Sequence, residues 1–157
     1  MAKSLLKLKN YELHAIGSSF EGRFNCNIAT WLMQTSMDSK TIAVALFKSD
    51  LTIEWVKSSN RLSVNFLSQP QARLINVLGR KSGRDTDKLK KIGFGISPGG
   101  CPFLLESIGY LDCEVSHWAE AGDHEIAICK VQKVVVLNPE KEPLRLNYLR
   151  EKGLVRG

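Results

Sequence analysis

No stretch of this sequence approaches the roughly 20 consecutive apolar residues that a membrane-spanning helix needs. The first nine residues, MAKSLLKLK, are basic but have neither a long apolar segment nor a small-residue cleavage site, so no signal peptide is expected. Internal repeats, low-complexity tracts and glycosylation sequons are also absent. Together these absences predict a single domain over residues 1–157, located in the cytoplasm and without a membrane partner.

Cysteine is scarce, with four residues and no Cys-x-x-Cys pair. Because no export signal is present, we expect free thiols rather than a disulfide framework. The three histidines, His14, His117 and His124, are scattered and lack the spacing of metal ligands. No metal site is therefore predicted.

The charge balance is basic, since 22 Lys+Arg against 16 Asp+Glu gives +6. That excess suits an anionic partner such as nucleic acid or a phosphate-bearing ligand, although on charge alone a solvated surface is the favoured interpretation. Binding of nucleic acid by a basic β-barrel needs aromatic residues interleaved with basic ones on the strands. Phe47, Phe66 and Tyr110 do not follow that pattern, so no nucleic-acid partner is expected.

Apolar patterning predicts strands over 11–16, 24–36, 41–47 and 62–66 in the first half. Asp50 is a suitable N-cap for a helix over 51–58, with Ile53 and Val56 on its apolar side. The segment 68–71, SQPQ, is a capping box with proline in the first turn. A second helix is therefore expected to run to Leu78 and stop at Gly79.

In the second half, residues 86–92 predict a short basic helix and residues 97–100 a turn. Two long strands are expected over 110–118 and 124–137, joined by a glycine-containing hairpin connection at 120–123. The pattern as a whole predicts a mainly β protein, with the strands forming a closed or partly closed barrel and short helices at its rim.

Two glycine-containing segments suggest nucleotide binding, but their context excludes it. The segment 93–100, GFGISPGG, has no strand before it and no helix after it, and 79–84, GRKSGR, lacks the Gly-Lys-Ser/Thr ending of a phosphate loop. We interpret the basic residues over 80–88 as a solvated loop, with contact to a nicotinamide dinucleotide as the alternative.

A series of short motifs occurs in a specific order: NIATWLMQTS (27–36), IAVALFK (42–48), SVNFL (63–67) with Gln71, TDKL (86–89), LDCEV (111–115) and GDH (122–124). Their order and spacing, over about residues 10–135, resemble the flavin reductase-like family of FMN-binding split barrels. That family has an Asn-x-x-Thr opening, a serine at the end of the same strand, a Val-Asn-x-Leu strand and a Gly-Asp-His hairpin. One departure is MDSK (37–40), which stands where many relatives have proline and places an aspartate near the expected flavin slot.

The resemblance implies a Greek-key split β-barrel that forms a homodimer and binds FMN, or FAD, near the subunit interface. It implies hydride transfer from NADH or NADPH to the flavin and onward transfer of electrons to free flavin, a ferric chelate or a redox protein partner. A flavin-binding electron relay without direct NAD(P)H activity is the alternative. An ultraviolet-visible spectrum and an NAD(P)H oxidation assay would separate these hypotheses.

The same resemblance implies a set of flavin-binding residues: Asn27, Ala29, Thr30, Trp31, Gln34, Ser36, Lys48, Ser49, Thr52, Asn65 and Leu67. On one strand, Thr30 shares its face with Gln34 and Ser36, whereas Asn27 lies on the opposite face unless a bulge intervenes. Taken alone, Trp31 is more typical of a core residue than of a flavin-stacking one.

Lys48, Ser49 and Thr52 come together at the expected start of the first helix, where hydroxyls, free N–H groups and an ammonium suit a phosphate. The two hydroxyl residues are also ordinary first-turn residues. His124 is the predicted catalytic residue, because it follows the Gly-Asp turn and can hydrogen-bond a nicotinamide carboxamide or the flavin edge. A histidine that bonds only a neighbouring backbone group is the alternative.

Overall fold

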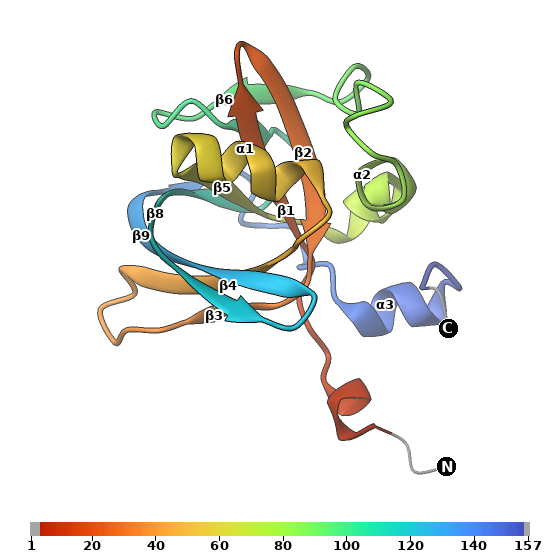
Figure 1. Cartoon of the computed structure of the whole chain (residues 1–157). Helices are drawn as coiled ribbons and strands as arrows, with labels where there is room; N and C mark the ends of the chain where they lie inside the picture. Colours follow the sequence, from red (N-terminus) through yellow and green to blue (C-terminus); the bar gives the residue numbers. More distant parts are fainter. Residues whose placement is uncertain (1–3, 156–157) are drawn as a thin grey trace.

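A computed structural model describes residues 4–155, and its main feature is a curled antiparallel sheet (Figure 1). The seven strands of this sheet pair in the order β2-β1-β5-β8-β9-β4-β3. In chain order they are β1 (His14–Phe20), β2 (Arg23–Ala29), β3 (Leu32–Gln34), β4 (Thr41–Phe47), β5 (Arg61–Phe66), β8 (Gly109–Ala121) and β9 (His124–Val136). The predicted fold class, a mainly β split barrel with short helices, is confirmed.

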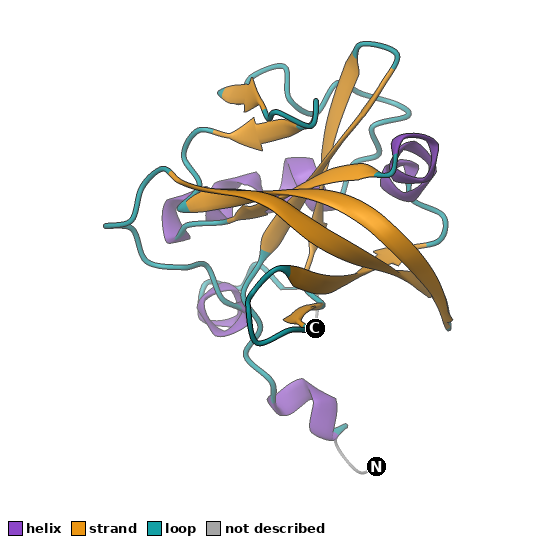
Figure 2. Ribbon diagram, turned by 90° about the vertical axis from the view of Figure 1, so that its left-hand side faces the viewer, coloured by secondary structure: helices purple, strands orange, loops and turns teal. Residues whose placement is uncertain are grey.

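The remaining elements lie outside the sheet. A small hairpin joins β6 (Phe94–Ile96) to β7 (Pro102–Leu104). The helices are η1 (Leu5–Leu8), α1 (Leu51–Ser59), η2 (Gln69–Leu74), α2 (Ile75–Gly79) and α3 (Leu146–Glu151). Figure 1 shows α1 lying across the barrel opening, while α2 and α3 lie on another flank. Figure 2 shows how strongly the long strands β8 and β9 curve.

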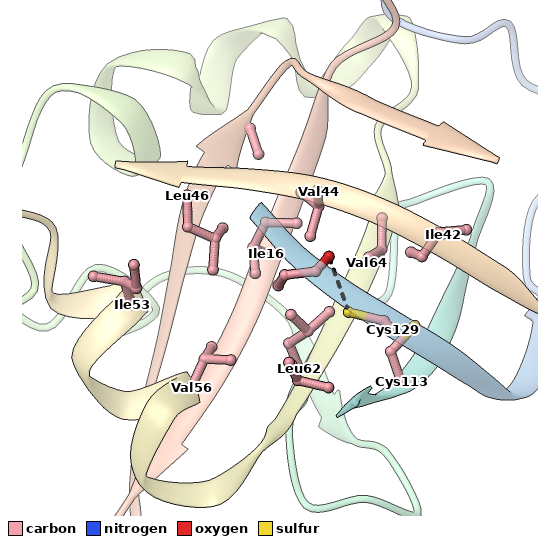
Figure 3. Close-up of a cluster of buried hydrophobic side chains, with 13 residues drawn as sticks. Ile16, Ile42, Val44, Leu46, Ile53, Val56, Leu62, Val64, Cys113 and Cys129 are labelled. Carbon is pink, nitrogen blue, oxygen red and sulfur yellow. Dashed lines mark hydrogen bonds between the residues drawn. The ribbon is translucent and has the colours of Figure 1, made fainter. Parts of the chain in front are cut away.

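The barrel interior is one of two hydrophobic cores (Figure 3). Ile53 and Val56 of α1 pack onto Leu62 and Val64 of β5, so the helix closes the barrel with the apolar side that the sequence predicts. The alternation in β5 is confirmed too, because Leu62 and Val64 face this interior while Ser63 and Asn65 point away from it.

The second core lies on the outer face of β1, β2 and β5. Leu13 and Leu67 meet Leu78 of α2 and Leu144 and Leu149 from the C-terminal segment. The capping box at Ser68 is confirmed: its backbone N–H donates to Gln71 Oε1 at 2.9 Å, and the first turns are 3₁₀ before α2 begins. This core fixes the position of the segment that follows α2.

Two secondary-structure predictions are wrong. The expected strand over 24–36 breaks after Ala29, and β3 begins only at Leu32. The expected helix over 86–92 is a series of turns, because Leu89 enters the second core while the neighbouring Lys88 reaches back to the Leu78 carbonyl at 2.7 Å. Lys88 and Leu89 are both buried although they are adjacent in sequence, and each is held by a different contact. The segment therefore lacks the single buried face of an amphipathic helix.

The hairpin between β8 and β9 is tighter than expected, with only Gly122 and Asp123 between the strands. Gly122 has φ of +64°, a left-handed conformation that glycine adopts without strain. The strand pairing places Phe47 of β4 opposite His124 of β9. The turn thus brings His124 to the edge of the barrel beside the end of β4.

Candidate functional site

A cleft opens where the two edges of the curled sheet approach each other. Strand β2 forms one edge of the sheet and β3 the other, next to β4, and the first turn of α1 closes the gap between β2 and β4. The cleft is lined by Ile16, Asn27, Ile28, Ala29, Thr30, Trp31, Ala45, Leu46, Phe47, Asp50, Thr52 and His124. Because β2 ends at Ala29, Thr30 and Trp31 leave the alternation of the strand and line the cleft. Asn27 and Thr30 therefore line the same cleft, although a spacing of three residues would place them on opposite faces of a regular strand.

The mouth of the cleft is aromatic. The Trp31 and Phe47 rings lie 4.9 Å and 5.2 Å from the His124 ring, and these two side chains are 51% and 40% exposed. Trp31 is therefore not a core residue. His124 Nδ1–H donates to the Asp123 carboxylate at 2.6 Å, and the other ring nitrogen has no hydrogen-bond partner among residues 4–155, so it is available to a ligand. Flat, partly exposed rings in this arrangement suit a planar aromatic ligand.

The floor of the cleft is polar and incompletely paired. Thr52 in the first turn of α1 is only 2% exposed, yet its Oγ1 has no hydrogen-bond partner among the described residues. Asn27 donates to the Asp50 carboxylate, and its own Oδ1 accepts from the Ile28 N–H at 3.0 Å. Buried hydroxyls without partners are rare in native proteins, so the Thr52 hydroxyl is a candidate donor to a ligand in the cleft.

A basic loop extends the cleft along β2. Residues 79–83 and Lys88 form its wall opposite Asn25, Asn27 and Thr52. Asn25 is 3% exposed, and its Oδ1 is a second buried acceptor without a partner in the described chain. Gly83 lies so close that an added Cβ would stand 2.6 Å from this Oδ1. Burial lowers the pKa of the Lys88 ammonium, which the Leu78 carbonyl holds in place.

Six of the residues that the sequence predicts lie together in the cleft: Asn27, Ala29, Thr30, Trp31, Thr52 and His124. The other six, which are Gln34, Ser36, Lys48, Ser49, Asn65 and Leu67, are absent from its lining. The predicted cluster at the start of α1 is therefore divided, with Thr52 turned inward and Lys48 and Ser49 exposed.

Gln34 and Ser36 belong to the turn between β3 and β4. Gln34 donates to the Ser36 carbonyl at 2.7 Å, and the Ser36 hydroxyl donates to Asp38 at 2.6 Å. Asp38 also accepts from the Lys40 N–H at 3.0 Å. These bonds hold the MDSK segment in a turn outside the cleft, and the aspartate lies there with it.

Lys48, Asn65 and Leu67 have local partners of their own. Lys48 pairs with Glu120 at the end of β8. Asn65 is fully buried, donating to the Ala15 carbonyl at 3.0 Å and accepting from the Leu104 N–H at 2.9 Å. Leu67 packs in the second core. None of these three residues belongs to the cleft lining.

The sequence interpretation missed Asn25, Phe47, Asp50 and the loop wall. Asn25 shares strand parity with Asn27, a signal that was available in the sequence. The loop carried no such signal, because only the packing of Leu89 and Lys88 turns it back over β2. The interpretation of 80–88 as a solvated loop fails at Lys88, which is 4% exposed, while its alternative, contact with a nicotinamide dinucleotide, stays a prediction.

The four cysteines are free and buried outside the cleft lining. Burial raises the pKa of the Cys26 and Cys129 thiols to about 12, so neither is a nucleophile at neutral pH. Over residues 4–155, no helix is long and apolar enough to span a membrane, and no group of three His, Cys, Asp or Glu residues has the arrangement of a metal site.

Comparisons with known proteins agree with this geometry. The chain is 31% identical over 153 residues to a high molecular weight rubredoxin of Moorella thermoacetica, covering 96% of this chain and 66% of that protein. It is 28% identical over 118 residues to a flavin reductase of Pseudomonas putida, covering 74% of this chain and 66% of that protein. The chain thus spans just under two thirds of the length of each of these two relatives.

Among solved structures, an FMN-binding protein from Thermus thermophilus superimposes with a TM-score of 0.78 at 22% identity, covering 85% of this chain and 75% of that one. At that identity the likeness shows the fold. The family model described as "Flavin reductase like domain" matches residues 13–153. The chain therefore belongs to the flavin reductase-like family.

Proposed function

We propose that this chain binds FMN in the cleft and acts as an oxidoreductase that uses NADH or NADPH and passes electrons to a further acceptor. The observation that carries the proposal is Thr52, which lines the cleft and whose buried hydroxyl has no partner in the described chain. The aromatic mouth and the basic wall on either side of it supply the two other surfaces that a phosphorylated planar ligand needs.

In this proposal, the ligand phosphate lies at the start of α1. The first-turn N–H groups of a helix have no intrahelical acceptors and attract an anion. Thr52 adds a hydroxyl donor there, and Lys81 and Ser82 face it from the loop wall. Asp50 is turned toward Asn27 by their hydrogen bond, and its carboxylate can accept from a hydroxyl of the ribityl chain.

The ring end of the ligand lies between Trp31, Phe47 and the backbone after Ala29. A bound flavin supplies the hydride and electron chemistry, and the protein residues bind and orient the reactants. Asp123 fixes the His124 ring through Nδ1. The free Nε2 can then bond a nicotinamide carboxamide at the mouth, where it positions the hydride donor against the flavin.

A binding titration tests the phosphate assignment. Thr52→Val removes the hydroxyl at nearly constant volume, so the Kd for FMN, followed by flavin fluorescence, should rise about tenfold, as expected for one charge-assisted hydrogen bond. Ser58→Ala changes a hydroxyl at the other end of α1, which bonds only the Glu54 carbonyl, and should leave the Kd unchanged. An unchanged FMN affinity in Thr52→Val would refute the assignment.

Stopped-flow reduction tests the role of His124. His124→Ala should slow flavin reduction at saturating NAD(P)H about tenfold or more, while the Kd for FMN stays within about twofold. His117→Ala is the matched control, because His117 is exposed on β8 and its ring bonds only Ser116. If His124→Ala instead loses FMN or unfolds, with no separate effect on the reduction rate, the histidine is structural.

An electron relay without direct NAD(P)H activity is the second candidate function. It is favoured by one observation, namely that a relative matched over 96% of this chain is named a high molecular weight rubredoxin and not a flavin reductase. In that case a redox protein is the partner. Purified protein loaded with FMN should then oxidise neither NADH nor NADPH, yet accept electrons from a chemically reduced partner protein.

We also propose a homodimer as the functional assembly. Val134 and Val136 on β9 are 62% and 64% exposed, and they border an apolar groove that includes Phe66 and Tyr110. A second copy covering this groove would remove that surface from water. Light scattering at micromolar concentration should report a dimer, and Val134→Lys should report a monomer with unchanged folding.

A further inference from the structure

The N-terminal segment carries three leucines that the rest of the described chain does not cover. Leu5, Leu6 and Leu8 are 78%, 69% and 77% exposed, and the short helix η1 that holds them buries no residue. Figure 1 and Figure 2 both show this turn standing clear of the sheet and of the other helices. Single exposed leucines are ordinary on protein surfaces. Three within four residues concentrate apolar surface at one place, as contact surfaces do.

The base of this segment is fixed to the body of the protein. Residues 10–13 run antiparallel to residues 144–147, where the Leu13 N–H donates to the Leu144 carbonyl at 2.8 Å. This pairing leads the chain away from the barrel, and in Figure 1 the segment passes α3 before η1 begins. The three leucines are therefore held away from the cores of their own chain.

An open apolar groove lies where β5 ends and β8 begins. Phe66 and Leu111 line this groove and also pack against the barrel core. Val134 and Val136 of β9 border it and are 62% and 64% exposed. Because alternate residues of a strand share a face, these two valines present one apolar surface. The groove thus extends the core outward, and residues 4–155 leave it open.

The segment and the groove match in position and in charge. Glu12 belongs to the groove lining and follows Leu8 by four residues, a distance of about 13 Å in an extended chain. Lys7 and Lys9 flank Leu8, whereas Glu12 and the exposed Glu142 lie at the groove. In a twofold dimer each copy offers one segment and one groove, so every segment finds a groove on the other copy.

We propose that two copies of this chain exchange their N-terminal segments, so that Leu5, Leu6 and Leu8 of each copy lie in the groove of the other. The inference rests on the proposed homodimer and assigns the contact that holds it together. Removal of the leucine side chains from water is the driving force, and the same contact covers Val134 and Val136. The flanking lysines fix the direction of the segment and add little affinity, because exposed ion pairs are screened.

The dimer dissociation constant, measured by light scattering of the full chain over a range of concentrations, tests the leucines. The triple variant Leu5→Ser, Leu6→Ser and Leu8→Ser should raise this constant about a hundredfold or more. Its circular dichroism spectrum should stay that of the wild type, because η1 buries no residue. Lys7→Gln is the matched control in the same turn, and it should change the constant by less than about threefold.

A disulfide between copies tests where the segment lies. Copies carrying Leu6→Cys are mixed with copies carrying Val136→Cys and oxidised, and a covalent dimer of the two kinds of copy should form. The four native cysteines are buried and do not compete. Ser58→Cys is the control partner, because Ser58 is exposed at the end of α1, outside the groove lining, and should form no such dimer.

Four outcomes would overturn the inference. An unchanged dissociation constant in the triple variant removes the exchange, and the proposed homodimer then stands without it. If the mixed copies form no disulfide while one chain carrying both Leu6→Cys and Val136→Cys closes one internally, each segment lies in its own groove. If the triple variant stays dimeric but loses binding to phosphatidylglycerol vesicles, the leucines contact a membrane surface. A wild-type chain that is monomeric defeats the homodimer and the exchange together.

Discussion

Buried polar side chains on β5 and in the cleft differ in whether their polar atoms have hydrogen-bond partners. On β5, Ser63 donates to the Pro102 carbonyl at 2.5 Å, and Asn65 bonds both Ala15 and Leu104. In the cleft, Thr52 Oγ1 and Asn25 Oδ1 are as deeply buried and have no partner in the described chain. Fully bonded polar groups connect strands to each other, while unbonded ones facing a cleft indicate a ligand.

Burial alone does not distinguish a polar residue that connects strands from one that is available to a ligand. Asn65 and Thr52 were both predicted to bind the flavin, and both are buried. Only their bonding separates them, and bonding depends on what the fold brings alongside. For Asn65 that is β1 on one side and β7 on the other. We therefore expect substitutions in the two groups to affect different measurements.

The largest effect is expected at Asn65. Asn65→Ala removes three hydrogen bonds, among them the side-chain acceptor of the buried Leu104 N–H and a donor to the Ala15 carbonyl. The free energy of unfolding, measured by urea denaturation without flavin, should fall by about 3 kcal/mol or more. Asn76→Ala, an exposed substitution on α2, should leave it nearly unchanged. If Asn65→Ala lowers the free energy of unfolding by less than about 1 kcal/mol, the hydrogen bonds of Asn65 do not stabilise the fold as proposed.

Asn25 should show the opposite pattern. Its side-chain oxygen has no partner to lose, so Asn25→Ala should change the free energy of unfolding by no more than about 1 kcal/mol. The Kd for FMN should rise about threefold to tenfold, the value of one neutral hydrogen bond. Titration and denaturation of the same sample measure both quantities. A large loss of stability with unchanged FMN affinity would place Asn25 with the structural group.

The sequence predicts the helix and turns that position the cleft better than it predicts the loop that lines it. Local signals specify the apolar side of α1, the capping box at Ser68, and the Gly122 turn that delivers His124, whereas Asp50 occupies the N-cap position of α1 without a side-chain capping bond. Each of these depends on residues a few positions apart. The loop wall depends instead on Leu89 packing against residues of distant elements, including Leu13 and Leu149. No short-range pattern encodes such a contact.

A buried histidine that is hydrogen-bonded within the fold, His14, leads to a prediction of how the free energy of unfolding depends on pH. His14 Nδ1–H donates to the Ala29 carbonyl at 3.2 Å, and burial lowers the pKa of this histidine below 6.5. Below pH 6.5 the unfolded chain therefore binds a proton at His14 more readily than the folded chain does. The free energy of unfolding consequently decreases as pH falls through 6.5. The slope due to His14 cannot exceed about 1.4 kcal/mol per pH unit.

Denaturation between about pH 5 and 8 measures this dependence. The variant His14→Gln keeps an N–H donor near the Ala29 carbonyl but does not titrate, so its stability should depend less on pH in that range. His117→Gln is the control, since its ring is exposed and bonds only Ser116. Equal pH dependence in wild type and His14→Gln would show that the buried histidine contributes nothing to it.

The smallest effect is expected at Lys48, where the sequence and the structure lead to different expectations. The motif places an ammonium just before α1, beside the proposed phosphate. In the structure this side chain is 38% exposed and pairs with Glu120, and Lys48 is absent from the cleft lining. Exposed ion pairs contribute little because water and salt screen them. Lys48→Ala should therefore change the Kd for FMN by less than about twofold, and stability by less than about 1 kcal/mol. Lys81→Ala, on the loop wall, should weaken FMN binding several-fold in the same titration. If Lys48→Ala proves the more damaging of the two, the phosphate lies outside the cleft, toward the β8–β9 turn, and the unpaired Thr52 hydroxyl is not its donor.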